Sequence, residues 1–404
     1  MSVLKGNVLY GQSGGPSPVI NSSAYGVIKC ANKHRDVIGK IYAAKNGIKG
    51  ILEDNLYDID TQNKEDIELL PHTPGAAFGS VRYKLKDFKE DDTAYKIILK
   101  IFQKYNIRYF FYNGGNDSMD TCDKINRYLK TVKYDCRVIG IPKTIDNDLP
   151  LTDHTPGFAS TAKYLINSIM ELGYDSKCYP KGRINIVEIM GRNAGWLTAS
   201  SYIASINGYG PDLIYLPEVP FDLDKFIADV TKIYNNKNSC LVAVSEGIKD
   251  KNGNFISEQK SKDAFGHSQM GGVGLYLSNL LQEKGYNTRS IEPSLLQRSA
   301  THLSSLTDVK EAIKTGEKAL EFALKGQSGK MVCIERVSSL PYKIKYVTCK
   351  LENVANVEKI VPISMINKEG NFMTKEFETY ITPLLIGENN SKFVNGVVRF
   401  SKIK

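Results

Sequence analysis

The chain has 404 residues, 42% of them hydrophobic and 24% charged, which is typical of a globular protein with a sizeable core. Its formal net charge of +9 favours anionic ligands. The basic residues are spread along the chain without a basic cluster, which argues against nucleic-acid binding. We find no apolar stretch of about 18 residues and no secretory signal pattern. The seven cysteines show no metal-type spacing, so we expect reduced thiols in a cytoplasmic protein. The length predicts two domains, and we expect no membrane segment.

Short apolar runs rich in Val, Ile and aromatic residues predict buried strands. These runs cover residues 3–10, 107–112, 137–141, 184–190, 212–216, 241–245 and 330–334. Amphipathic stretches predict helices at residues 20–32, 92–105, 117–131, 158–172, 192–206, 223–235, 267–285 and 308–324. The polar segment 249–266 is expected to be an exposed insertion. The alternation predicts an α/β fold of mostly parallel sheets covered by helices, with ligands at the carboxyl ends of the strands.

Two glycine-rich segments each follow a predicted strand. The first, GQSGGPSP, starts at Gly11, and the second, GGNDSMD, starts at Gly114. Glycines let backbone N–H groups approach an anion, and the N-terminus of the following helix adds positive potential. The first segment fits neither the GxGxxG nor the Walker pattern, so by itself it is equally consistent with a tight turn. In the second, capping by Asn116 or Asp117 explains neither glycine, and the two segments together favour a shared phosphate site.

The segment GIPKTIDND (140–148) is the most informative. It places Lys143, Thr144, Asp146 and Asp148 just beyond a predicted strand. A lysine offers positive charge to a phosphate, and two neighbouring carboxylates suit a general base supported by a metal ion or a charge. A simple surface turn requires none of these, so we interpret the segment as functional.

The segment MGRNAGW (190–196) also follows a predicted strand, and we expect Arg192 at the head of the next helix, where its guanidinium can bind an anion. Two shorter segments, SEG (245–247) and QRS (297–299), carry Glu246 and Arg298. Taken singly, both residues would be surface charges in most proteins.

Together these motifs resemble the phosphofructokinase family. The matching segments, in chain order, are GQSGGPSPVIN (11–21), GSVR (79–82), GGNDS (114–118), PKTIDND (142–148), RINIVEIMGR (183–192), SEG (245–247) and QR (297–298). The resemblance implies two similar α/β lobes, each with a mostly parallel sheet, and an active site in the cleft between them. It assigns residues 1–157 plus about 306–380 to a lobe that binds the donor phosphate. Residues 158–305 plus the C-terminal segment would form the lobe that binds the sugar phosphate.

By this resemblance, Asp146 is the base that takes the sugar hydroxyl proton. Catalysis would also involve Lys143, Asp117, Asp148 and Arg192. The sugar phosphate would be bound by Thr144, Ile145, Asp146, Met190, Gly191, Arg192, Glu246 and Arg298, and by Arg183 from a neighbouring subunit of a homodimer or homotetramer. The donor phosphate would meet Gly14, Arg82, Gly115 and Lys143. Mg²⁺ would be held at Asn116, where relatives often have Asp.

The resemblance implies phosphoryl transfer from pyrophosphate to the 1-hydroxyl of fructose 6-phosphate. ATP-dependent members usually have Gly at the positions of Asp117 and Lys143, which favours pyrophosphate as the donor. An ATP-dependent enzyme is the nearest alternative, and activity on other sugar phosphates such as sedoheptulose 7-phosphate stays open. A nicotinamide-dependent dehydrogenase would need the missing GxGxxG spacing. A binding-only protein would be expected to lack the acids of TIDND, and both are present.

Overall fold

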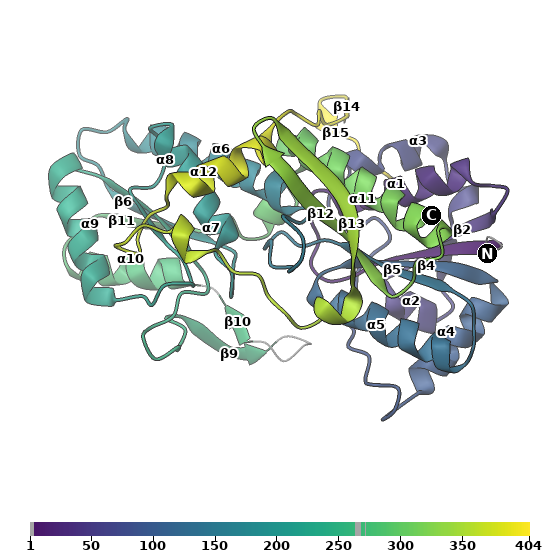
Figure 1. Cartoon of the computed structure of the whole chain (residues 1–404). Helices are drawn as coiled ribbons and strands as arrows, with labels where there is room; N and C mark the ends of the chain where they lie inside the picture. The colour runs from purple at the N-terminus through teal and green to yellow at the C-terminus, as the bar shows by residue number, and fades with distance from the viewer. Residues whose placement is uncertain (1–3, 263–267, 271) are drawn as a thin grey trace.

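The structure is a computed structural model that describes residues 4–262, 268–270 and 272–404. The chain forms two lobes that lie side by side, each built around one β-sheet (Figure 1). Near the two ends of the described chain, Leu4 and Ile403 both pack against the core of the lobe with the larger sheet. The α/β class predicted from the sequence is confirmed.

The sheet of the first lobe has seven strands. In spatial order they are β13 (Tyr342–Lys350), β12 (Lys330–Ser339), β5 (Arg137–Pro142), β4 (Ile107–Gly114), β1 (Gly6–Gln12), β2 (Ile38–Ala44) and β3 (Leu56–Asp58). The five central strands are parallel, and the two edge strands are antiparallel to their neighbours. Because the central strands are parallel, their carboxyl ends meet at one edge of the sheet.

Alternating side chains bury both faces of this sheet. Val8 and Tyr10 of β1 pack on one face with α1 (Ile20–Lys33) and α11 (Leu306–Leu324). Leu9 packs on the opposite face with α2 (Ile48–Leu52), α4 (Thr93–Lys104) and α5 (Asn116–Thr131). A strand with two buried faces reads as a continuous apolar run, which explains why the sequence predicts these strands so clearly. The short helix α3 (Lys64–Glu68) completes this lobe.

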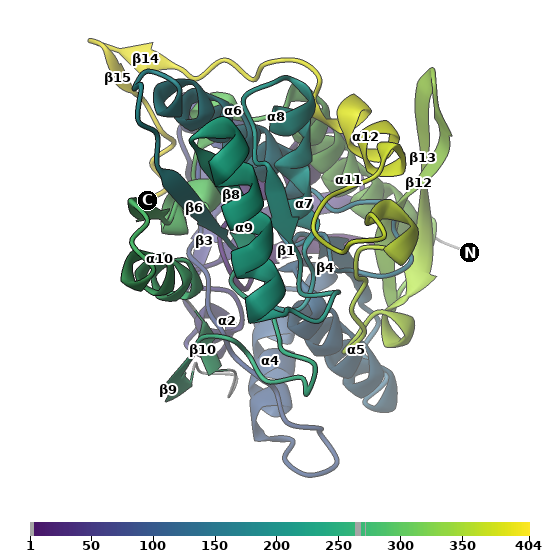
Figure 2. The same cartoon turned by 90° about the vertical axis from the view of Figure 1, so that its left-hand side faces the viewer.

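The sheet of the second lobe is fully parallel, in the order β11 (Thr288–Ile291), β6 (Ile184–Ile189), β8 (Cys240–Ser245) and β7 (Leu213–Tyr215). One face packs against α9 (Leu223–Lys237) and α10 (Val273–Glu283), as Figure 2 shows. The other face packs against α6 (Phe158–Ser176), α7 (Trp196–Ser200), α8 (Tyr202–Ile206) and α12 (Lys375–Ile381). Two pairs of short antiparallel strands are β9 (Glu258–Lys262) with β10 (Ser268–Met270) and β14 (Phe393–Val394) with β15 (Val397–Val398).

The segment after β13, residues 351–404, passes between the lobes. After β13, side chains from Val361 to Leu384 pack into the core of the second lobe. The chain then returns to the first lobe, where the backbone N–H of Ser401 donates to Thr73 Oγ1 at 2.9 Å. Within the described residues, every helix is too short or too polar to span a membrane.

All seven predicted strands are present, with small differences at their ends. The sequence patterns missed the remaining strands, which are β2, β3, β9, β10, β11, β13, β14 and β15. The helix predicted at residues 267–285 is wrong at its start, because β10 covers Ser268–Met270 and α10 begins at Val273. The helix predicted from residue 192 is wrong at its start, because α7 begins at Trp196. Residues 191–195 form a loop in which Gly191 has a φ of +148° and the Gly195 N–H donates to Glu218. Residue 3, and residues 263–267 and 271 of the predicted insertion and of the helix predicted at 267–285, lie outside the described residues.

Candidate active site

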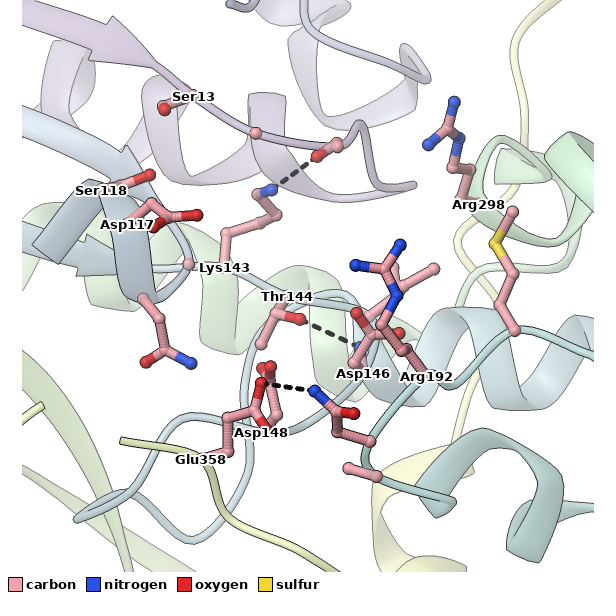
Figure 3. A pocket seen from close by; sticks show the side chains of 18 of the residues that line it. Ser13, Asp117, Ser118, Lys143, Thr144, Asp146, Asp148, Arg192, Arg298 and Glu358 are labelled. Atoms are coloured by element: carbon pink, nitrogen blue, oxygen red, sulfur yellow. Dashed lines mark hydrogen bonds between the residues drawn. The ribbon is translucent and has the colours of Figure 1, made fainter. Parts of the chain in front are cut away.

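Side chains from both lobes line a cavity of about 330 Å³ (Figure 3). The loops that follow β1, β4 and β5 contribute from the first lobe, and those that follow β6 and β8 contribute from the second. The carboxyl ends of the two sheets therefore face one space. Its volume is in the range of small-molecule sites, about 300–1,000 Å³.

The loop after β1 brings its backbone into the cavity next to Lys143. Gly14 has a φ of +76°, a conformation that favours glycine, and a Cβ built there would lie 3.4 Å from Lys143 Nζ. The Lys143 ammonium donates to the Gly15 carbonyl, and the Lys143 N–H donates to Gly114 O at 3.0 Å. The hydroxyl of Ser80 donates to Gly14 O at 2.6 Å and ties the GSVR segment to this loop. These contacts join four of the motifs predicted from the sequence into one anion-binding corner.

Lys143 is only 4% exposed, and burial lowers its pKa to about 8. The carboxylates of Asp146 and Asp148 oppose this effect, while Arg82 and Arg298 add to it. The ammonium is therefore a desolvated charge close to two acids. Such a charge interacts with a bound anion more strongly than one in water does.

Asp146 and Asp148 follow Lys143 in a loop with an internal support. The backbone N–H of Asp146 donates to Thr144 Oγ1 at 3.0 Å, and between the two acids Asn147 has a φ of +56°. Asn147 is held in this conformation because its side-chain oxygen accepts from Thr155 N at 3.0 Å.

Burial raises the pKa of both acids, because a carboxylate in the cavity loses its hydration. Glu246 raises the pKa of Asp146 further, while Lys143 and Arg192 lower it. For Asp148, the charge of Asp146 is the next raising cause. A carboxylate whose proton affinity is increased in this way is suited to accept a proton from a substrate hydroxyl near neutral pH.

The loop after β6 forms the opposite wall of the cavity. The backbone N–H of Gly191 donates to Glu246 Oε1 at 3.2 Å, and that of Met190 donates to Gln297 Oε1 at 3.2 Å. Arg192 lies beside Asp146 (Figure 3), and its buried Nε has no hydrogen-bond partner among the residues that the structure describes. A buried guanidinium N–H without an acceptor is costly, and an anionic substrate group would supply the acceptor.

Arg298, at the end of the 3₁₀ helix Ser294–Arg298, enters the cavity from the second lobe. Burial lowers its pKa, the positive charge of Arg82 has the same effect, and Asp146 opposes it. Two arginines from different lobes therefore repel each other across the cavity, and a bound phosphate would relieve this repulsion.

Two buried oxygens fit a divalent cation. Asn116 Oδ1 and Asp148 Oδ1 both belong to residues that line the cavity, and neither has a hydrogen-bond partner within the described part of the chain. No cluster of three His, Cys, Asp or Glu side chains suited to a metal is found among the described residues. Mg²⁺ is ordinarily held by one or two protein oxygens together with waters and substrate phosphates, and these two oxygens fit that pattern.

The structure brings nearly all of the predicted site residues to this cavity. The cavity-lining members of that set are Gly14, Arg82, Gly115, Asn116, Asp117, Lys143, Thr144, Ile145, Asp146, Asp148, Met190, Arg192, Glu246 and Arg298. Gly191 lies in the same loop as Met190 and Arg192. Arg183 does not reach the cavity: it precedes β6, roughly 20 Å from the strand end that does. Its guanidinium lies 5.8 Å from the ring centre of Tyr179.

The sequence reasoning missed several residues of the cavity wall. Ser13, Ser118 and Asn193 also line it, and each stands beside a motif residue that could have pointed to it. Glu358 lines it too, but it comes from the segment after β13 and belongs to no motif. Its carboxylate accepts a hydrogen bond from Asn193 Nδ2 at 3.0 Å.

Two parallel sheets that present basic residues, glycine loops and a pair of buried acids to one cavity define a class of protein: a two-lobed α/β enzyme that transfers phosphoryl groups. The comparison with known proteins agrees and is more specific. The sequence profile of the phosphofructokinase family matches residues 7–323, and this chain belongs to that family.

Several relatives match over nearly their whole length. The chain is 42% identical to pyrophosphate--fructose 6-phosphate 1-phosphotransferase of Halomonas elongata over 401 residues, which cover 98% of this chain and 96% of the relative. Its fold is similar to crystal structures of pyrophosphate-dependent phosphofructokinases. That from Marinobacter aquaeolei has a TM-score of 0.89 at 38% identity, covering 99% of this chain and 96% of the other. That from Nitrosospira multiformis has a TM-score of 0.90 at 38% identity, covering 98% and 96%.

Proposed function

We propose that this chain transfers a phosphoryl group from pyrophosphate to the 1-hydroxyl of fructose 6-phosphate, giving fructose 1,6-bisphosphate and phosphate. The observation that carries the proposal is the placement of Lys143 and Asp146 in one buried loop, with the Gly14 backbone on one side and Arg192 on the other. One end of the cavity can therefore bind a donor phosphate and the other a sugar phosphate. The relatives described above carry the same activity in their names.

In the reaction, the 1-hydroxyl oxygen attacks the nearer phosphorus of pyrophosphate and the bridging P–O bond breaks. Asp146 accepts the hydroxyl proton as the new O–P bond forms. Lys143 and the backbone N–H groups near Gly14 stabilise the charge on the leaving phosphate. Phosphoryl transfer depends mainly on positioning and on charge stabilisation of this kind, so no covalent enzyme intermediate is needed.

Arg192 and Arg298 bind the phosphate of the sugar. A guanidinium presents two parallel N–H donors to phosphate oxygens, a geometry that lysine cannot reproduce. Mg²⁺ would be held at Asn116 Oδ1 and Asp148 Oδ1, and when bound it supplies charge neutralisation to the transferred phosphoryl group.

All seven cysteines are free, which supports a reducing cytoplasmic location.

Asp117 supports pyrophosphate over ATP as the donor. It stands in the first turn of α5 and lines the cavity beside Gly115 and Lys143. A nucleotide donor would have to place an additional phosphate and a ribose near this carboxylate, and the like charges would repel in a partly desolvated site.

Arg183 does not reach the cavity of its own chain, although the family resemblance assigns it to the sugar phosphate. This supports a homo-oligomeric enzyme in which each site receives Arg183 from the neighbouring subunit. Mixing two inactive variants, Arg183→Ala and Asp146→Asn, should then restore activity, because some mixed sites contain both native residues. Mixed oligomers without recovered turnover would exclude a shared site.

The proposed function is tested by comparing donors. Purified protein is incubated with fructose 6-phosphate, Mg²⁺ and either pyrophosphate or ATP, and fructose 1,6-bisphosphate is measured. We expect product with pyrophosphate and much less with ATP. Faster turnover with ATP would favour the ATP-dependent alternative.

A further inference from the structure

The loop that carries the two acids depends on distant parts of the chain for its conformation. Both Asn147 and Leu151 adopt positive φ angles, +56° and +61°, which residues with a Cβ rarely adopt. Such a backbone conformation persists only when neighbouring groups hold it. The groups that hold this loop are therefore of interest for the reaction.

Lys359, which lies in the segment after β13, contacts this loop through its backbone and its side chain. The backbone N–H donates to the carbonyl oxygen of Asp148 at 2.6 Å. The side-chain nitrogen donates to the carbonyl oxygens of Thr152, at 3.1 Å, and Asp153, at 2.9 Å. A single residue thus binds three carbonyl oxygens along the loop, beginning at Asp148 itself.

The same lysine is bound from the other lobe by the first residue of α7, the helix that follows the loop carrying Arg192. The indole Nε1–H of Trp196 donates to the carbonyl oxygen of Lys359 at 3.0 Å, and the Lys359 nitrogen lies 5.2 Å from the centre of the indole ring. The preceding residue, Glu358, accepts from Asn193 of the same loop. Lys359 is therefore clamped between the loop of the acids and the loop that faces the sugar phosphate.

The surroundings suit a lysine that acts as a hydrogen-bond donor. Burial lowers the pKa of Lys359 to about 8, while Asp153 and Asp148 oppose the shift. The amine also donates to Asn147 Oδ1, at 3.5 Å, so the three N–H groups of the ammonium match three oxygen acceptors.

We propose that Lys359 is a positioning residue that holds Asp146 and Asp148 at the correct place relative to the sugar-binding loop. The proposal rests on the function proposed above. Lys359 would act on the chemical step, because a misplacement of the reacting groups by about 1 Å can lower the rate by roughly 10²-fold while substrate binding persists.

The test replaces Lys359 by Met, which has an unbranched side chain one atom shorter and removes the side-chain N–H donors, while the backbone hydrogen bond to Asp148 remains. We expect kcat to fall by about 10- to 100-fold, while KM for pyrophosphate and for fructose 6-phosphate changes less than about threefold. The matched control is Lys163→Met on α6. Lys163 also donates to a backbone carbonyl, Gly387 O at 2.6 Å, but it lies outside the cavity wall. The control should lose stability without losing kcat.

Trp196 provides a direct readout, because it is the only tryptophan in the chain. Its fluorescence emission should shift in Lys359→Met and stay unchanged in Lys163→Met. Lys359→Gln keeps N–H donors on a shorter side chain and should give an intermediate kcat at unchanged KM. If the Lys359→Met variant does not fold, kcat and KM of the Lys359→Gln variant test the proposal instead.

A folded Lys359 variant with the same kcat as the wild-type enzyme would overturn the proposal. An equal loss of kcat in the Lys163→Met control would also overturn it. A loss confined to KM would overturn it too. If the unmodified protein shows no pyrophosphate-dependent transfer, the proposed function fails instead, so the two failures can be told apart.

Discussion

Replacing Asp146 by Asn is expected to abolish most of the turnover without destabilising the protein. The amide has the same shape as the carboxyl group, and the hydrogen bond to Thr144 Oγ1 comes from the Asp146 backbone and survives. A positioned general base contributes roughly 10²–10⁴-fold to the rate. At about 1.4 kcal/mol per factor of ten, this corresponds to about 3–6 kcal/mol of the activation barrier.

The same substitution, Asp146→Asn, should leave the stability of the protein unchanged or increase it, although it lowers turnover. Burial, and then the charge of Glu246, raise the pKa of Asp146 in the folded state above its unfolded value. Such a group contributes stability below the unfolded pKa, and this contribution is lost as the pH rises through the folded-state pKa. A tenfold difference in proton affinity between the folded and unfolded states corresponds to about 1.4 kcal/mol of folding free energy. Asparagine is neutral throughout, so the variant should be at least as stable as the unmodified protein at pH 7, and any gain should vanish near about pH 4.

The assay measures phosphate release at saturating pyrophosphate and fructose 6-phosphate, together with the melting temperature at both pH values. Asp123→Asn on α5 is the matched control, because Asp123 forms a surface ion pair with Arg127, at 2.8 Å, away from the cavity. The control should retain full turnover. Turnover of Asp146→Asn within tenfold of the unmodified enzyme, or a lower melting temperature at pH 7, would refute the reasoning.

Four further outcomes are expected. Asp117→Gly should make ATP a measurable donor, because it removes the charge that repels a nucleotide; no ATP-dependent product would contradict this. Turnover should fall as the pH rises through about 8, where Lys143 loses its proton, and Lys143→Arg should move that fall to higher pH. Arg298→Ala should raise KM for fructose 6-phosphate at least about tenfold more than KM for pyrophosphate; equal effects would argue against its role. Asn116→Asp should lower the Mg²⁺ concentration for half-maximal turnover, since a carboxylate binds Mg²⁺ more strongly than an amide.

Much of the first lobe and most of the site could be predicted from the sequence because their signals are local. Strands β1, β4 and β5 are buried on both faces, so each contains a continuous apolar run. β4 ends at Gly114 and β5 at Pro142, and β1 ends at Gln12, one residue after Gly11. The polar residues that follow them stand at the carboxyl end of a parallel strand. The family resemblance added roles for these residues, and the structure places nearly all of them around one cavity.

Other elements carried no clear local signal. β13 alternates between partly buried and exposed residues at the edge of its sheet, so its sequence shows no continuous apolar run. The loop at residues 191–195 is built from contacts to Glu218, which lies beyond β7, and the helical pattern in the sequence therefore begins too early.

The sequence by itself determined which segments are strands and which strand ends carry anion-binding chemistry, because burial and motif spacing are properties of neighbouring residues. Only the tertiary structure decided what meets those strand ends. Lys359 and Glu358 reach the site because the apolar side chains from Val361 to Leu384 bury themselves against the second sheet. That packing draws the preceding residues across the cavity, so the side chain of Lys359 donates to Asp153 from 206 positions along the chain. The contact depends on how two cores pack together, and no local pattern around Lys359 records it.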